Sequence, residues 1–210
     1  AHMESHKKHP RTCSFEFFPP KTAEGKEKLR ATWKQLGQLK PKFFSCTFGA
    51  GGSTREGTLE TVLEIRTAGF EAAPHLSCIT SSRADLKAQI EKYKSHGIRH
   101  VVALRGDLPS GLVASGELRY ANELVAFIRE VTGDWFHIEV ACYPEYHPQT
   151  RLAADEIRNF KRKVDAGANS AITQYFYNAD AYYRFVDDCE AAGIAIPIVP
   201  GIMPIGNFAQ

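Results

Sequence analysis

The sequence has no long apolar run, although 43% of its 210 residues are hydrophobic. No stretch approaches the roughly 20 apolar residues that a membrane-spanning helix needs, and the first residues lack the apolar core of a signal peptide. We therefore expect a protein of the cytoplasm with no membrane partner. The opening Ala-His-Met resembles the remnant of a cleaved tag, so residues 1–11 are expected to be that remnant and a flexible arm.

Paired cysteines and a strong charge of one sign are also missing. The five cysteines are widely spaced and form no C-x-x-C pair, so buried, reduced thiols are expected rather than disulfides or a metal site. The formal net charge is only +2, and the basic residues are scattered among acidic ones. This pattern argues against a nucleic-acid partner and favours small-molecule substrates.

One pattern does recur along the whole chain: an apolar strand, a loop, an amphipathic helix and a glycine. Within the helical segments apolar residues recur at helical spacing, as at Leu86, Ile90 and Tyr93. Ser82 and Asp85 have the spacing of a capping box at one helix start. The glycines expected to end helices recur at roughly the length of a βα unit; they are Gly37, Gly69, Gly97, Gly133, Gly167 and Gly193.

Seven short segments rich in β-branched and aromatic residues are expected to be strands. They are 13–18, 43–48, 71–76, 100–105, 137–143, 171–176 and 196–202. Because no Gly-x-Gly-x-x-Gly loop follows the first strand, seven consecutive βα units favour an α/β TIM (βα)8 barrel over a doubly wound sheet. We expect residues 12–210 to be one barrel domain, truncated at the C-terminus so that the eighth strand is missing.

Polar residues stand near the carboxyl ends of six of these strands, where barrels carry their reacting groups. An unpaired buried polar group costs about 1–3 kcal/mol, so stability alone does not explain such a set. We expect these side chains to converge on a ligand. They are Glu16, Thr47, His75, Arg105 with Asp107, Tyr143 with His147, and Gln174.

Two short motifs suggest other functions. The Arg-Gly-Asp tripeptide at 105–107 is a cell-adhesion motif in secreted proteins, but here it follows a core strand in a chain without an export signal. The glycine-rich segment 49-GAGGSTREG-57 superficially suggests a phosphate loop, yet it lacks the G-K-[ST] ending. An active-site edge is the favoured interpretation of the first, and a flexible ligand-contacting loop of the second.

Six ordered segments resemble the methylenetetrahydrofolate reductase family in its bacterial, FAD-dependent form. They are 14-SFEFFPPKT-22, 73-APHLSC-78, 100-HVVALRGDLP-109, 143-YPEYHP-148, 161-KRKVDAGANSAITQYFY-177 and 200-PGIMPI-205. The resemblance implies a flavoprotein oxidoreductase of one-carbon metabolism and methionine biosynthesis, acting on CH-NH donors. Such an enzyme binds FAD and takes hydride from NADH or NADPH. It reduces 5,10-methylenetetrahydrofolate to 5-methyltetrahydrofolate in a ping-pong reaction. Family members commonly form homo-oligomers.

The resemblance assigns catalysis to Glu16, Asp107 and Gln174. Opening the substrate ring requires protonation of the leaving nitrogen, and Glu16, flanked by Phe15 and Phe17, is a carboxyl whose pKa an apolar setting would raise. Asp107 would steady the cationic iminium, and the Gln174 amide would hold the pterin or the nicotinamide. The alternatives are an outward-facing glutamate in a salt bridge, a turn aspartate and a core glutamine.

The resemblance also implies the ligand contacts. The FAD contacts would be Thr47, Phe48, Ala50, His75, Arg105, Gly106, Asp107, Tyr120, Ala121, Tyr143, His147, Glu156, Asn159, Arg162 and Lys163. The folate contacts would be Glu16, Thr47, Asp107, Gln174 and Gln210. Taken alone, His75 would more often be a core histidine, and 161-KRK-163 a solvated helix face. Phe48 and Glu156 stand where many relatives carry tyrosine and aspartate.

Two further hypotheses stay open beside the reductase. One is a truncated, non-catalytic fragment that binds flavin or folate. The other is a folate-dependent demethylating methyltransferase barrel that uses no flavin. Bound flavin, and its bleaching by a reduced nicotinamide, would separate the three. No motif that reads the nicotinamide ribose is recognisable, so NADH and NADPH stay equivalent.

Overall fold

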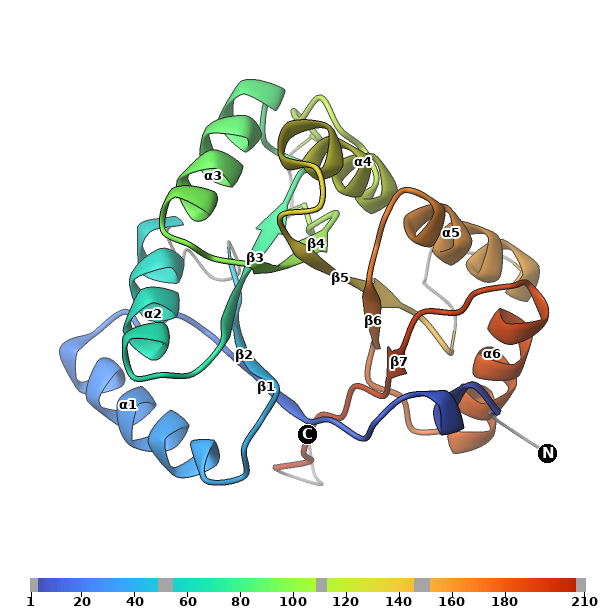
Figure 1. Ribbon diagram of the computed structural model, residues 1–210, viewed down its shortest axis with the longest axis horizontal. Helices are drawn as coiled ribbons and strands as arrows, with labels where there is room; N and C mark the ends of the chain where they lie inside the picture. Colours follow the sequence, from blue (N-terminus) through green and yellow to red (C-terminus); the bar gives the residue numbers. More distant parts are fainter. Residues whose placement is uncertain (1–3, 49–54, 109–112, 146–151, 207–210) are drawn as a thin grey trace. The chain divides into compact units, whose positions relative to one another are not determined.

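The computed structural model describes residues 4–48, 55–108, 113–145 and 152–206. Strands and helices alternate through these segments, which confirms the predicted α/β class (Figure 1). The strands are β1 (Ser14–Phe17), β2 (Phe43–Cys46), β3 (Ala72–Ser77), β4 (His100–Leu104), β5 (His137–Cys142), β6 (Ser170–Thr173) and β7 (Ile198–Val199). The helices are α1 (Ala23–Gly37), α2 (Arg55–Thr67), α3 (Arg83–Ser95), α4 (Ala121–Thr132), α5 (Ala153–Asp165) and α6 (Ala179–Ala191).

The strands follow one another in chain order in a seven-stranded sheet, as a TIM barrel requires. The pairs β1–β2, β2–β3, β3–β4, β5–β6 and β6–β7 are parallel. The chain divides into two compact units, one of residues 11–138 and one of residues 1–10 with 139–210. No helix of the described segments is long and apolar enough to cross a membrane.

In the unit of residues 11–138, an aromatic cluster fills the space between the sheet and its helices. Helices α1, α2 and α3 lie on one side of strands β1 to β4 (Figure 1). The fully buried Phe44 ring stacks on Phe17 with centroids 5.4 Å apart and meets Phe70 edge-on at 5.5 Å. Phe70 in turn meets the buried Trp33 of α1. Burial of these rings supplies much of the driving force that holds α1 against the sheet.

The predicted helix signals are found at most of the expected positions. Five of the six marked glycines have positive φ, between 59° and 122°, as a helix-ending residue requires. Gly37 is instead the last residue of α1, and a Cβ added there would lie 2.4 Å from Cζ of Phe70. At the start of α3 the Ser82 side chain accepts a hydrogen bond from the Asp85 N–H, at 3.1 Å, as the capping pattern predicts.

Two predicted strands are shorter than the sequence suggests. The segment 196–202 contains only the two-residue β7, because Pro197 and Pro200 flank it and have no N–H to donate to a ladder. β6 ends at Thr173, so Gln174 follows the strand instead of lying on it. One ladder hydrogen bond still continues past this end, from the Gln174 N–H to the Cys142 carbonyl at 2.8 Å.

The second unit contains β5 from Glu139 onward, β6, β7, α5, α6 and a short 3₁₀ helix, η1 (Glu4–Lys8). Phe160 of α5 stacks on Phe185 of α6 with centroids 5.8 Å apart. η1 lies against α6, where His6 Nε2 is 2.7 Å from the Tyr182 hydroxyl. The segment expected to be a flexible arm therefore contains one ordered turn with a defined neighbour.

Candidate active site

Strand pairing brings Glu16, Ser45 and His75 together. Glu16 of β1 is the register partner of Ser45 of β2, and Ser45 is the partner of Ala73 of β3. Side chains two residues apart on a strand leave the same face, so His75 joins this group from one step further along β3. His75 Nε2 lies 3.2 Å from Ser45 Oγ and 3.5 Å from Glu16 Oε2.

The surroundings shift the pKa values of Glu16 and His75 in opposite directions. Burial raises the pKa of the Glu16 carboxyl, although 58% of its side chain is exposed. Burial lowers the pKa of His75 to about 4, which keeps its imidazole neutral near pH 7. The thiol of Cys46, next to Ser45, has its pKa raised to about 12 by burial and is also neutral. The group therefore places a carboxyl with a raised pKa beside a neutral imidazole.

The reason for the raised pKa differs from the one the sequence suggested. Phe15 and Phe17 flank Glu16 in sequence, but alternation along β1 turns both rings to the opposite face. There they pack against Phe44, at centroid distances of 6.1 Å and 5.4 Å. Phe18 is 69% exposed. The carboxyl is desolvated by the strand face that it shares with Ser45 and His75, and not by its phenylalanine neighbours.

The depressed pKa of His75 predicts a loss of stability in acid. The unfolded chain would protonate this imidazole near its ordinary value of 6.5 and the folded chain only near 4. The contribution of His75 to the free energy of unfolding is therefore fully present above about pH 6.5. It is lost as the pH drops toward 4, and the loss amounts to about 3 kcal/mol. Urea unfolding at pH 7 and pH 4.5 should show a steeper loss in the wild type than in His75→Phe. Equal losses of unfolding free energy in the wild type and in His75→Phe would show that His75 is not the source of the acid sensitivity.

At the end of β2, Thr47 presents a hydroxyl suited to a ligand. The side chain is buried, and within the described segments its Oγ1 has no hydrogen-bond partner. Its backbone is held on both sides, because its N–H donates to the Phe17 carbonyl and its carbonyl accepts from the Thr58 hydroxyl. Its neighbour Phe48 lies under the Arg55 guanidinium, 5.7 Å from the ring centroid. A buried hydroxyl without a partner is costly unless a ligand satisfies it.

The Arg-Gly-Asp segment follows β4 directly. The Arg105 carbonyl accepts hydrogen bonds from the N–H groups of Cys78 and Ile79, at 3.2 and 3.0 Å, which anchors the segment to the end of β3. Gly106 has φ 88°, and a Cβ there would lie 2.8 Å from the Ser77 Cβ. Arg105 is half-buried and Asp107 is exposed. A backbone held in this way is unlike the free tip of an adhesion loop.

The start of α4 carries the two remaining predicted residues of this unit. Tyr120 precedes the helix and is 57% exposed, while Ala121 is its first residue and is buried. The carboxylate of Glu123 accepts hydrogen bonds from the N–H groups of Arg119, at 2.7 Å, and Tyr120, at 3.3 Å. This cap fixes the direction in which the chain enters α4.

In the other unit, Lys163 differs from the expectation of a solvated helix face. Its ammonium donates to the Ala141 carbonyl at 2.8 Å and lies 5.5 Å from the Tyr143 ring centroid. Burial lowers its pKa. Glu156, one of the two buried residues of α5, contributes a favourable charge to it. Lys163 thus offers a cation at the end of β5, while Arg162 points to solvent.

Three other predicted residues of this unit are exposed: Asn159, Arg162 and Gln174. The Arg162 guanidinium donates to the Asn159 side-chain oxygen at 3.3 Å. The Gln174 side-chain oxygen accepts a hydrogen bond from the Tyr175 N–H at 3.1 Å. Ala50, His147 and Gln210 lie outside the described residues.

The family follows from comparison with known sequences. The sequence profile of the methylenetetrahydrofolate reductase family matches residues 2–210. The chain belongs to the methylenetetrahydrofolate reductase family. It is 49% identical over 199 residues to 5,10-methylenetetrahydrofolate reductase of Salmonella typhimurium and 48% identical to that of Escherichia coli. Each comparison covers 94% of this chain and 66% of the relative, so the chain spans about two thirds of their length.

Solved structures confirm the fold of this family member at low sequence identity. An uncharacterised Clostridium thermocellum protein that binds two copies of 5-methyl-5,6,7,8-tetrahydrofolic acid has a TM-score of 0.68 and 14% identity, over 94% of this chain and 68% of that one. A phosphonopyruvate hydrolase complexed with oxalate and Mg²⁺ has a TM-score of 0.61 at 11% identity, over 94% and 77% of the two chains. Both support the strand-and-helix architecture alone.

Each unit has a residue suited to part of a flavin dinucleotide, the cofactor that the family resemblance implies. Such a cofactor needs hydrogen-bond donors for its ring and cations for its pyrophosphate. In one unit, Thr47 offers a buried hydroxyl without a partner among the described residues. In the other, Lys163 offers a half-buried ammonium. The individual contacts stay predictions.

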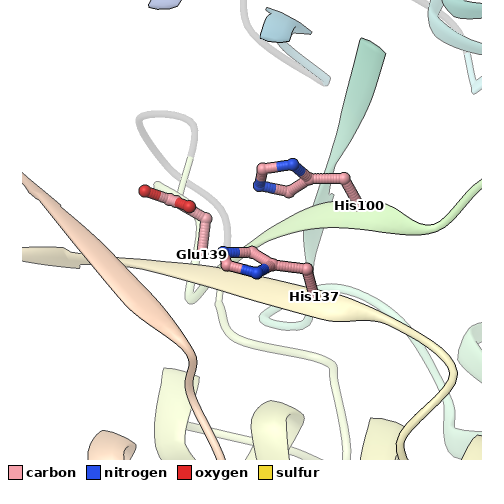
Figure 2. Close-up of side chains that lie close together, drawn as sticks. All are labelled: His100, His137 and Glu139. Atoms are coloured by element: carbon pink, nitrogen blue, oxygen red, sulfur yellow. The ribbon is translucent and has the colours of Figure 1, made fainter. Parts of the chain in front are cut away.

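One group of polar residues in the reductase-family chain had no place in the sequence predictions. His100 and His137 begin β4 and β5, and their rings lie 4.5 Å apart, with Phe43 4.1 Å from His100. Glu139 lies two residues after His137 on β5 (Figure 2). The spacing 137-HIE-139 at a strand start was the available signal.

The surroundings of these residues indicate a structural role. They stand at the amino ends of their strands, the end of a barrel that contributes stability and not chemistry. The Glu139 carboxylate accepts a short hydrogen bond from the Ser170 hydroxyl within its own unit. Each of the three residues therefore has packing or hydrogen-bond partners of its own.

Proposed function

We propose that this chain carries the flavin site and the acid of a reductase that converts 5,10-methylenetetrahydrofolate to 5-methyltetrahydrofolate with NADH or NADPH as electron donor. The observation that carries the proposal is Glu16, a carboxyl on β1 of a family member whose burial raises its pKa. A raised pKa is what a general acid needs near neutral pH.

The residues of the chain have separate roles in this proposal. Glu16 donates its proton to the nitrogen that leaves when the five-membered ring of the substrate opens, and is left as a carboxylate. Asp107 faces the cationic iminium that results and stabilises its charge. The amide of Gln174 orients the pterin. FAD, when bound, supplies the capacity to accept a hydride from the nicotinamide and deliver it to carbon.

The role of Asp107 can be tested by removing its charge alone. Asp107→Asn is expected to slow reduction of methylenetetrahydrofolate about 10- to 100-fold, because the developing cation loses its counter-charge. Rapid-mixing measurement of the folate half-reaction reports this rate. Asp134→Asn, at an exposed turn after α4, is the matched control and should leave the rate unchanged. An Asp107 variant as fast as this control would remove the proposed role.

The proposed function itself is tested with the purified protein and added FAD. The protein should show the visible absorbance of a bound flavin, and NADH or NADPH should bleach it under anaerobic conditions. Mass spectrometry should then detect 5-methyltetrahydrofolate after addition of methylenetetrahydrofolate. A colourless protein, or one whose flavin neither nicotinamide bleaches, would contradict the proposal. A homo-oligomer and a location in the cytoplasm stay predictions.

A further inference from the structure

His75 presents one ring nitrogen to two possible partners. Its Nε2 lies 3.2 Å from Ser45 Oγ, within hydrogen-bonding distance, and 3.5 Å from Glu16 Oε2, just beyond it. A ring nitrogen of a neutral imidazole carries either one proton or one lone pair. It can therefore serve only one of these two oxygens at a time.

The protonation states of the group limit which hydrogen bonds can form. His75 is buried and neutral, so one of its nitrogens donates and the other accepts. The Ser45 hydroxyl can donate to an acceptor, and so can a protonated Glu16 carboxyl. A hydrogen bond from the acid to an acceptor stabilises the protonated form, whereas an N–H donated to the carboxylate would stabilise the charged form. Burial already raises the pKa of Glu16, and a hydrogen bond from the protonated carboxyl to Nε2 would raise it further.

We propose that His75 is a positioning residue for Glu16: its unprotonated Nε2 accepts a hydrogen bond from the protonated carboxyl, and the Ser45 hydroxyl takes that place once the proton has left. The inference rests on the proposed role of Glu16 as the acid. It adds His75 and Ser45 to the reaction as residues that act through Glu16.

The exchange accounts for every proton. The O–H bond of Glu16 breaks as an N–H bond forms on the leaving nitrogen of the substrate. His75 neither gains nor loses a proton, and Ser45 only rotates its hydroxyl toward Nε2. In the structure Ser45 Oγ lies nearer to Nε2 than Glu16 Oε2 does, at 3.2 Å against 3.5 Å, so both oxygens are within reach of the exchange. Because Ser45 is buried and neutral, it can satisfy the imidazole without adding charge to the site.

The tautomer of His75 tests the proposal in the wild-type protein. With ¹⁵N-labelled histidine, NMR should show the proton on Nδ1 and a bare Nε2. The Nε2 resonance should move as Glu16 titrates and should lose that movement in Glu16→Gln. A proton found on Nε2 would overturn the proposal, because His75 would then donate to the carboxylate and favour its charged form.

The competition between Ser45 and Glu16 is tested by a double-mutant cycle. ¹³C NMR of labelled glutamate gives the pKa of Glu16 directly. Ser45→Ala removes the competing hydroxyl and should raise this pKa by about half a pH unit. In a His75→Phe background the same substitution should leave it unchanged. An equal rise in the pKa of Glu16 with and without His75 would show that Ser45→Ala acts only by making the site less polar. That result would contradict the proposed exchange of hydrogen bonds at His75. If His75→Phe does not fold, the tautomer measurement still decides.

These measurements separate the inference from the proposed function. Both NMR experiments are read without substrate turnover. A protein with the expected tautomer and coupling but no reductase activity would reject the function and leave the hydrogen-bond arrangement standing. An active reductase with a proton on Nε2 would support the proposed function and reject the hydrogen-bond arrangement.

Discussion

Replacing Glu16 with glutamine is expected to abolish reduction of methylenetetrahydrofolate while reduction of the flavin by NADH or NADPH survives. Glutamine keeps the size and the hydrogen-bonding capacity of the side chain but has no proton to give to the leaving nitrogen. A positioned general acid contributes about 10²- to 10⁴-fold to a rate, so the folate half-reaction should fall by at least about 100-fold. Anaerobic rapid mixing measures the two half-reactions separately.

The matched control for this variant is Glu24→Gln. Glu24 lies in the first turn of α1, and its exposed carboxylate pairs with Lys28 at 2.7 Å. The same loss of charge there should leave both half-reactions at wild-type rates. Loss of both half-reactions in Glu16→Gln, or of neither, would remove Glu16 from the role of acid.

The largest effect on stability is expected from Phe44→Ala. The Phe44 ring is fully buried between Phe17 and Phe70, and its removal leaves a cavity behind the strand that carries Glu16. Substitutions of this kind cost about 3–5 kcal/mol, a large share of the 5–15 kcal/mol that holds a typical domain together. Denaturant unfolding followed by tryptophan fluorescence should show this loss, because Trp33 packs on Phe70.

The same change at Phe18 serves as the control. Phe18 is 69% exposed, so Phe18→Ala should change the free energy of unfolding by no more than about 0.5 kcal/mol. Similar losses for the two variants would show that the aromatic cluster behind β1 and β2 contributes little. They would also weaken the explanation of why Glu16 faces Ser45 and His75.

Much of the fold was predictable from local signals. The recurring glycines, at Gly69 and Gly97 for example, end helices because positive φ is costly for other residues. The spacing of apolar residues identified the helices, since one face of each must be buried. The failures were also local: prolines at 197 and 200 shorten β7, and β6 ends before Gln174. The strand propensities of residues do not show at which residue a β-ladder lacks the backbone N–H donors that it needs.

The site was predictable only in part, because its geometry depends on strand register. Glu16 was identified as an acid, but its apolar surroundings were assigned to flanking phenylalanines that turn out to face the other way. Ser45 was not predicted at all, because only its pairing with Glu16 across β1 and β2 gives it a role. Lys163 was predicted to contact the cofactor, but its hydrogen bond to the Ala141 carbonyl was not predicted, because that contact depends on how α5 packs.

The most direct test of the proposed reductase is reoxidation of the pre-reduced protein by methylenetetrahydrofolate. The protein is loaded with FAD, bleached with one equivalent of NADH or NADPH without oxygen, and mixed with the folate while the visible absorbance is recorded. We expect the flavin colour to return in the wild type with formation of 5-methyltetrahydrofolate, and to stay bleached in Glu16→Gln. A flavin that stays bleached in the wild type, or one that recovers equally fast in both proteins, would contradict the assignment of Glu16 as the acid of this reaction.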